Sequence, residues 1–162
     1  MSKRISMLAI YIALAFIFSY IEAIFPFSIG FPGIKLGLAN IITVYVLFAT
    51  GNIKDTFIVM ILRIILAAFT FGNLSLMIYS MAGGMLAAVV MCTFYKTHLF
   101  GITGVSVTGG VAHNVGQLIV AAIMLETKEI LFYVPVLLAA GVITGLIVGA
   151  LAGTCVNRIH PK

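Results

Sequence analysis

Four polar residues that could bind a ligand stand inside long apolar runs of this sequence. Arg63 interrupts the run I-L-R-I-I-L, and His113, Asn114 and Gln117 lie close together in G-G-V-A-H-N-V-G-Q-L. An arginine can hold an anion through a planar pair of N–H donors, and imidazole and amide groups both donate and accept hydrogen bonds. His113 and Gln117 would share one face of a helix. These residues indicate a binding site for a small ligand that carries an acidic or carbonyl group.

Each feature also has a purely structural explanation. Arg63 could be an anchor that is bonded only to carbonyl or amide groups of neighbouring helices, because a charge at the centre of a membrane helix needs a partner. The cluster around His113 could serve only to hydrogen-bond one helix to another. The sequence leaves both alternatives open.

Further polar residues lie toward one end of the apolar runs. Lys35, Asn40 and Ser80 complete the predicted ligand-binding set, whereas the opposite end holds Asp55 at its edge and scattered hydroxyl groups. Such hydroxyl groups can bond to carbonyl groups of their own helix. A channel would need a polar lining along its whole length, so this distribution predicts a pocket that opens to one side.

The sequence predicts neither a metal centre nor a catalytic centre. His98 and His160 lie near predicted helix ends, at a different depth from His113, and the only aspartate is Asp55. A prenyl synthase neutralises diphosphate with Mg²⁺ held by clustered aspartates, and an ATPase needs a glycine-rich loop with Lys and Ser or Thr. We therefore expect no metal, no cofactor and no catalysis by this chain alone.

Composition places these residues in a membrane. Of the 162 residues, 63% are hydrophobic and 8% are charged, against about 25% charged in soluble proteins. The net charge of +5 is scattered along the chain, so nucleic-acid binding is not expected. A membrane helix needs about 20 apolar residues, which predicts an all-α membrane protein, a compact six-helix bundle that forms a single transmembrane domain over residues 1–162. The predicted spans are 5–25, 36–50, 56–71, 74–95, 102–125 and 130–156.

Charge asymmetry predicts the orientation of these spans. Basic residues concentrate on the cytoplasmic side of membrane proteins. With a cytoplasmic N-terminus, the inner segments carry six basic residues and the outer segments two. The inner residues are Lys3, Arg4, Lys54, Lys96, Arg158 and Lys162, and the outer ones are Lys35 and Lys128. Both termini are therefore expected in the cytoplasm, and the pocket is expected to open outward.

Small residues mark two helix faces on which another helix could pack closely. The last span carries a glycine every four residues, and the first span carries a pair of alanines at the same spacing. The glycines are Gly141, Gly145, Gly149 and Gly153, and the alanines are Ala9 and Ala13. For the glycines, close packing within the chain and a docking surface for a partner both fit the pattern.

Three segments of the sequence resemble one protein family. They are P-G-I-K-L-G-L-A-N-I (Pro32–Ile41), L-R-I-I-L around Arg63, and H-N-V-G-Q-L (His113–Leu118). The family is bacterial and is known both as heptaprenyl diphosphate synthase component I and as Gx transporter. It looks related to the substrate-binding S components of energy-coupling-factor (ECF) transporters. The resemblance implies a six-helix protein in the cytoplasmic membrane that binds a vitamin-like solute from outside.

The resemblance also implies a role for the first helix. In S components an AxxxA pattern docks on a transmembrane coupling subunit, and Ala9 and Ala13 match that pattern. We therefore expect a substrate-binding subunit that captures a small or amphipathic anionic ligand for uptake, with a coupling subunit and ATPases as partners and lipid around it. The alternative is a non-catalytic accessory subunit in polyprenyl diphosphate or quinone metabolism, or in quinone-linked electron transfer, with an isoprenoid-like ligand.

Overall fold

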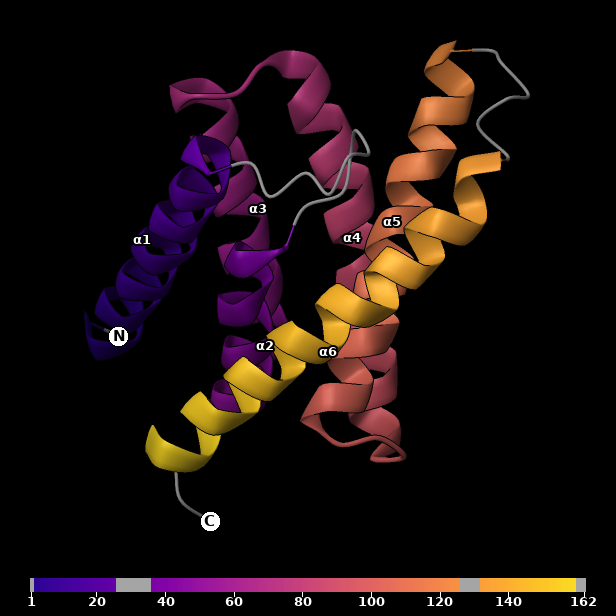
Figure 1. The fold of residues 1–162 in the computed structure, drawn as a ribbon. Helices are drawn as coiled ribbons and strands as arrows, with labels where there is room; N and C mark the ends of the chain where they lie inside the picture. Colours follow the sequence, from indigo (N-terminus) through magenta and orange to yellow (C-terminus); the bar gives the residue numbers. More distant parts are fainter. Residues whose placement is uncertain (1, 26–35, 126–131, 160–162) are drawn as a thin grey trace.

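The computed structural model describes residues 2–25, 36–125 and 132–159, and six α-helices make up most of these ranges (Figure 1). Each helix lies at the position of a predicted span, so the prediction of an all-α protein is confirmed. The helices are α1 (Ser2–Ile24), α2 (Leu38–Thr50), α3 (Ile53–Thr70), α4 (Leu74–Thr97), α5 (Ile102–Leu125) and α6 (Val134–Ile159).

Four of the helices are long and apolar enough to cross a bilayer: α1 from Lys3, α4, α5 and α6. This makes the chain an integral membrane protein. The other two helices, α2 and α3, differ from these four in length or in charge. The α2 helix has 13 residues because Gly37, with a φ of 72°, precedes its first turn. The α3 helix has 18 residues and carries Lys54, Asp55 and Arg63.

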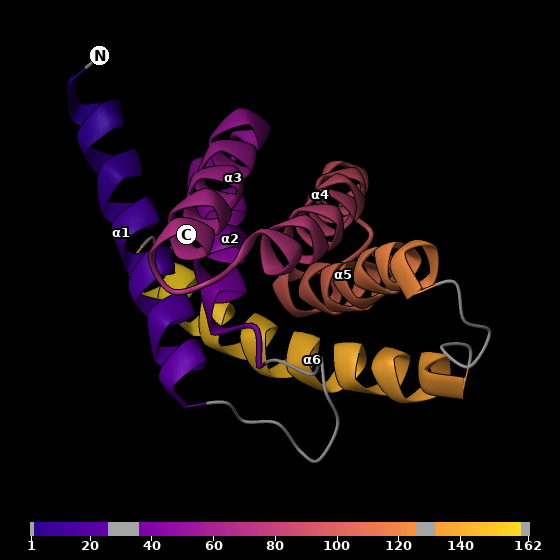
Figure 2. The ribbon, with the colours of Figure 1, turned by 90° about the horizontal axis from the view of Figure 1, so that it is seen from above.

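The helices form two groups that α6 joins. Figures 1 and 2 show α1, α2 and α3 on one side, α4 and α5 on the other, and α6 running obliquely across both. The α6 helix packs along α5 and reaches α2, while α3 meets α4 between the two groups. The N- and C-termini lie at the same end of the molecule (Figure 1).

The short α2 helix is the centre of the core. Every residue from Ile41 to Leu47 is buried, and Val46 and Leu47 have no exposed surface. A helix that is apolar on all sides is stable only where other elements surround it, which explains the unbroken run I-I-T-V-Y-V-L. The α1 helix is different, because Tyr11 and Ala15 are buried while Ile10 is 58% exposed. Its outer face is suited to lipid.

The α5 and α6 helices pack backbone against backbone through the glycine repeat. A Cβ added at Gly145 would lie 2.6 Å from the Cα of Val107, and one at Gly149 would lie 2.7 Å from the Cα of Thr103. Gly141 is similarly close to the carbonyl oxygen of Gly110. Gly153 is looser, since its added Cβ would be 3.9 Å from the nearest atom, on Ile102. The first three glycines of the repeat therefore pack against α5 of the same chain.

We expect Gly145→Ala to destabilise the protein by about 1–3 kcal/mol, because its methyl group would meet backbone that cannot rotate away. Gly153→Ala is the matched control, since it adds the same methyl group to the same helix at van der Waals distance. Equilibrium unfolding in detergent compares the two variants. A Gly145→Ala variant as stable as the control would show that close α5–α6 contact is not required.

Candidate functional site

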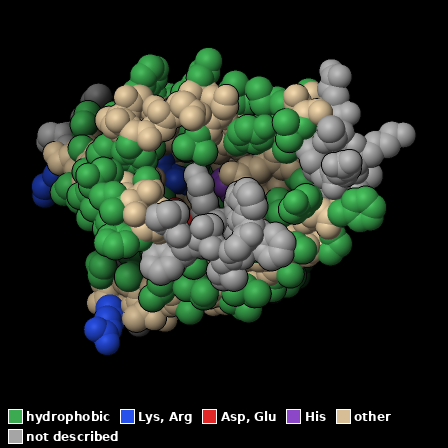
Figure 3. Space-filling view, turned by 45° about the horizontal axis from the view of Figure 1, so that its top comes forward, with side chains coloured by type: hydrophobic (Ala, Val, Ile, Leu, Met, Phe, Trp, Pro, Cys, Tyr) green, Lys and Arg blue, Asp and Glu red, His purple; other side chains and the backbone are tan. Residues whose placement is uncertain are grey.

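A cavity of about 150 Å³ lies between the two helix groups, toward the end of the bundle where α1 and α3 end and α4 begins. All six helices or their first flanking residues contribute to it. The polar residues that line it are Ser19, Glu22, Asn40, Arg63, Ser80, His113, Asn114, Gln117 and Thr144. The space-filling view shows basic and histidine side chains inside a hollow on this face (Figure 3).

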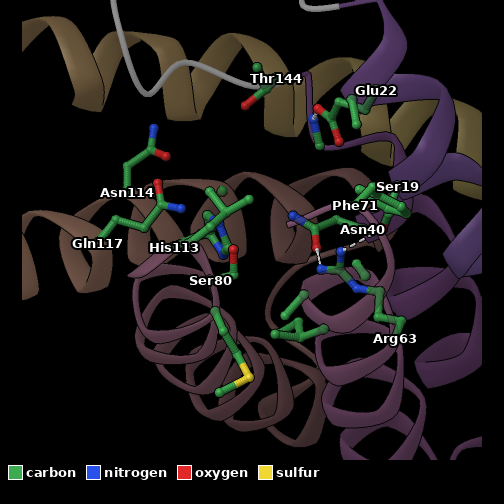
Figure 4. Close-up of a pocket in the computed structure, with 18 residues that line it drawn as sticks. Ser19, Glu22, Asn40, Arg63, Phe71, Ser80, His113, Asn114, Gln117 and Thr144 are labelled. Atoms are coloured by element: carbon green, nitrogen blue, oxygen red, sulfur yellow. Dashed lines mark hydrogen bonds between the residues drawn. The ribbon is translucent and has the colours of Figure 1, made fainter. Parts of the chain in front are cut away.

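One wall of the cavity is organised by Arg63 (Figure 4). Its Nη2 donates a hydrogen bond of 2.6 Å to Oδ1 of Asn40 on α2, and its Nη1 donates a longer one of 3.4 Å to Oγ of Ser19 on α1. The Ser19 hydroxyl in turn donates to the carbonyl of Ala15. The Nε of Arg63 is buried and has no hydrogen-bond partner among the described residues. The guanidinium thus links three helices, and Nη1 and Nη2 each keep a second N–H that these bonds do not use.

Glu22 adds a negative charge to the same wall. Its Oε1 accepts a hydrogen bond of 2.5 Å from the backbone N–H of Gly37, which ties the end of α1 to the start of α2. The carboxylate also attracts the Arg63 guanidinium electrostatically. A glycine is required at position 37 because its φ of 72° lies in the left-handed region. This local turn holds Glu22 and Asn40 beside Arg63.

The opposite wall consists of amide, imidazole and hydroxyl groups from α4 and α5 (Figure 4). The two helices approach closely at Gly83, where an added Cβ would lie 2.8 Å from the carbonyl oxygen of His113 and 2.9 Å from Cγ of Gln117. The Nδ2 of Asn114 donates a hydrogen bond of 2.6 Å to the carbonyl oxygen of Leu137 on α6. The Oδ1 of the same amide is its acceptor. Glycine at position 83 therefore lets α4 press against the side of α5 that carries the cluster.

The structure brings together six of the seven residues predicted to bind a ligand. Asn40, Arg63, Ser80, His113, Asn114 and Gln117 all line the cavity, and Lys35 lies outside the described residues. Ser19, Glu22 and Thr144 also line it and were not predicted as site residues. The acid in the apolar first helix was a usable signal for Glu22, whereas nothing local marked the two hydroxyl groups.

The structure also bears on the two alternatives for Arg63. The residue is hydrogen-bonded to other helices, as an anchor would be, and it lines a cavity with one N–H of each Nη uncommitted, as a ligand-binding residue would. No three His, Cys, Asp or Glu side chains converge as a metal site within the described residues. Ala9 and Ala13 lie on the exposed face of α1, away from buried Tyr11 and Ala15.

We expect Arg63→Met to destabilise the protein by about 1–3 kcal/mol, because Asn40 would be left as a polar group without its partner. The double variant Arg63→Met/Asn40→Leu should recover most of that loss, since replacing both partners by apolar groups can be nearly neutral. Equilibrium unfolding of the wild type, both single variants and the double variant gives the coupling. Additive losses would mean that the 2.6 Å bond contributes nothing to stability.

The comparisons with known proteins agree with the sequence resemblance. A family model described as heptaprenyl diphosphate synthase component I matches residues 11–155. Searches of the curated proteins and of the solved structures found no match. The matched range covers all but the first and last few residues of the chain and includes every described polar residue of the cavity. The chain therefore belongs to the heptaprenyl diphosphate synthase component I family.

Proposed function

We propose that the chain is a membrane substrate-binding subunit that captures a small anionic ligand from the outer side of the cytoplasmic membrane. The observation that carries this proposal is the Arg63 guanidinium at the cavity, in which Nη1 and Nη2 each donate one hydrogen bond and keep a second N–H that no described residue uses. An arginine in a membrane helix is expensive to keep. A ligand anion would offset that cost, and Asn40 and Ser19 would hold the guanidinium in place between binding events.

Orientation and size support uptake of a small solute. The cavity is lined by residues near the end of α1, whereas the start of α1 and the end of α6 lie at the other end of the bundle (Figure 1). With cytoplasmic termini, as the basic residues favour, the cavity opens outward. An apolar cavity of about 150 Å³ holds one benzene molecule. A cavity of this size is too small to enclose a heptaprenyl chain. We further propose that all six helices span the membrane, with α2 and α3 shielded by their neighbours.

Transport would require partners, and α1 offers a place for one. The exposed alanines Ala9 and Ala13 leave a shallow face on which a helix of a coupling subunit could pack closely. ATPases would then supply the energy. This division of labour follows the ECF-type arrangement that the sequence resembles.

A second function is favoured by the family name, which implies association with a heptaprenyl diphosphate synthase component. In that case the chain would be a non-catalytic membrane subunit that presents or receives an isoprenoid-like molecule. A polyprenyl or quinone ligand would then occupy the cavity with its head group only, and its chain would extend beyond the cavity.

Mass spectrometry of small molecules that co-purify with the detergent-solubilised protein distinguishes the two functions. We expect the wild type to carry a small anionic compound that the Arg63→Met/Asn40→Leu variant lacks, because this variant keeps the fold and removes the cation. A polyprenyl diphosphate or a quinone in the wild type would instead favour the accessory function. Identical small molecules in both proteins would contradict the role of Arg63.

Docking at α1 predicts a second result. Ala9→Leu or Ala13→Leu should abolish co-purification of a multi-pass membrane protein together with its ATPases, because a bulky side chain prevents close helix contact. Ala150→Leu, the same change at an exposed position on α6, is the control and should retain them. Stability should not change in any of the three variants. Retention of the partners by both α1 variants would refute docking through this face.

A further inference from the structure

The charges of the cavity limit the kind of anion that it can hold. Among the described lining residues, Arg63 is the only permanent cation and Glu22 is the only carboxylate. Glu22 already attracts Arg63 and bonds to the N–H of Gly37. A diphosphate carries several negative charges and is normally held by several cations or by a metal ion. Since Glu22 already offsets part of the Arg63 charge, these described residues can balance at most one negative charge, such as that of a carboxylate.

The opposite wall offers polar groups that are still available. The amide of Gln117 and the hydroxyl of Ser80 line the cavity, and neither makes a hydrogen bond with any residue that the structure describes. Figure 4 shows both across the cavity from Arg63. An amide presents a donor and an acceptor side by side, and a hydroxyl can act as either. Polar groups in a site from which lipid and water are displaced need partners.

Apart from its polar residues, the lining is apolar and includes Ile64, Ala67, Phe71 and Met77. We infer that the ligand is a small monocarboxylate with a neutral hydrogen-bonding group at its other end. Its carboxylate would take the remaining N–H groups of Nη1 and Nη2 of Arg63, and its far group would take the amide of Gln117 and the hydroxyl of Ser80. This inference rests on the proposed ligand-binding function and narrows it to one chemical class.

Matched pairs of acids test each end of the ligand separately. The probes are benzoate with 4-hydroxybenzoate, which differ only in a far hydroxyl group, and pentanoate with glutaramate, which ends in an amide. The uncharged 4-hydroxybenzamide and inorganic pyrophosphate test the charge. Binding is measured by titration calorimetry on the full chain in lipid nanodiscs.

For the wild type we expect the polar-ended acid of at least one pair to bind about three- to tenfold more tightly than its partner, the effect of one hydrogen bond. The uncharged amide should bind to the wild type at least about 30-fold more weakly than that acid does. The acid itself should bind to the Arg63→Met/Asn40→Leu variant at least about 30-fold more weakly than to the wild type. Gln117→Met keeps an unbranched side chain of similar length, and it should reduce the preference for the polar-ended acid to what Ser80 alone contributes. Unfolding measurements confirm that both variants are folded.

Three results would overturn the inference. Equal binding of both members in each pair by the wild type would exclude a role for the Gln117 wall. Tighter Arg63-dependent binding of pyrophosphate than of any acid would identify a diphosphate site. Failure of every acid to bind would exclude monocarboxylates as the ligand class. If an Arg63-dependent molecule still co-purifies with the protein, the proposed ligand-binding function survives. If none does, the ligand class and the proposed function are both refuted.

Discussion

The hydrogen bond between Arg63 and Asn40 is the constraint around which the cavity-bearing half of this protein is organised. A guanidinium inside a membrane helix has no water to solvate it, so its acceptors must come from neighbouring helices. Asn40 supplies one at 2.6 Å and Ser19 a weaker one at 3.4 Å. These bonds fix α3 against α2 and α1. Because they use only one N–H of each Nη, the same residue that joins the helices also remains available to a ligand.

Close backbone packing sets the opposite wall of the cavity. Gly83 brings α4 against α5 at His113, and the glycines of α6 bring that helix against α5 from another side. Larger residues at these positions would separate the helices and move Gln117 away from Arg63. The glycines therefore have a functional consequence without contacting a ligand, since they determine the width of the site.

Sequence reasoning identified the helices and most of the polar lining, because both depend on local features. Apolar runs between turn residues locate helices. A strongly polar residue inside such a run is expected to face the interior of the bundle, where other helices can supply its partners. The membership of Glu22 and Ser19 in the site could not be derived in this way. It depends on the turn at Gly37, which brings the start of α2 back to the end of α1, and on the packing of α1 across α3. The burial of α2 among the other helices is likewise a tertiary effect.

The central claim is that Arg63 offers its unused donor to a bound anion. A crystal structure of the protein purified directly from its native membrane, grown in a lipid phase, tests this claim most directly. The account predicts density for a small non-protein molecule with an oxygen atom about 3 Å from Nη1 or Nη2 of Arg63 and its far end toward Gln117. A structure in which the remaining Nη N–H groups are hydrogen-bonded to other residues of the chain, with no molecule in the cavity, would contradict it.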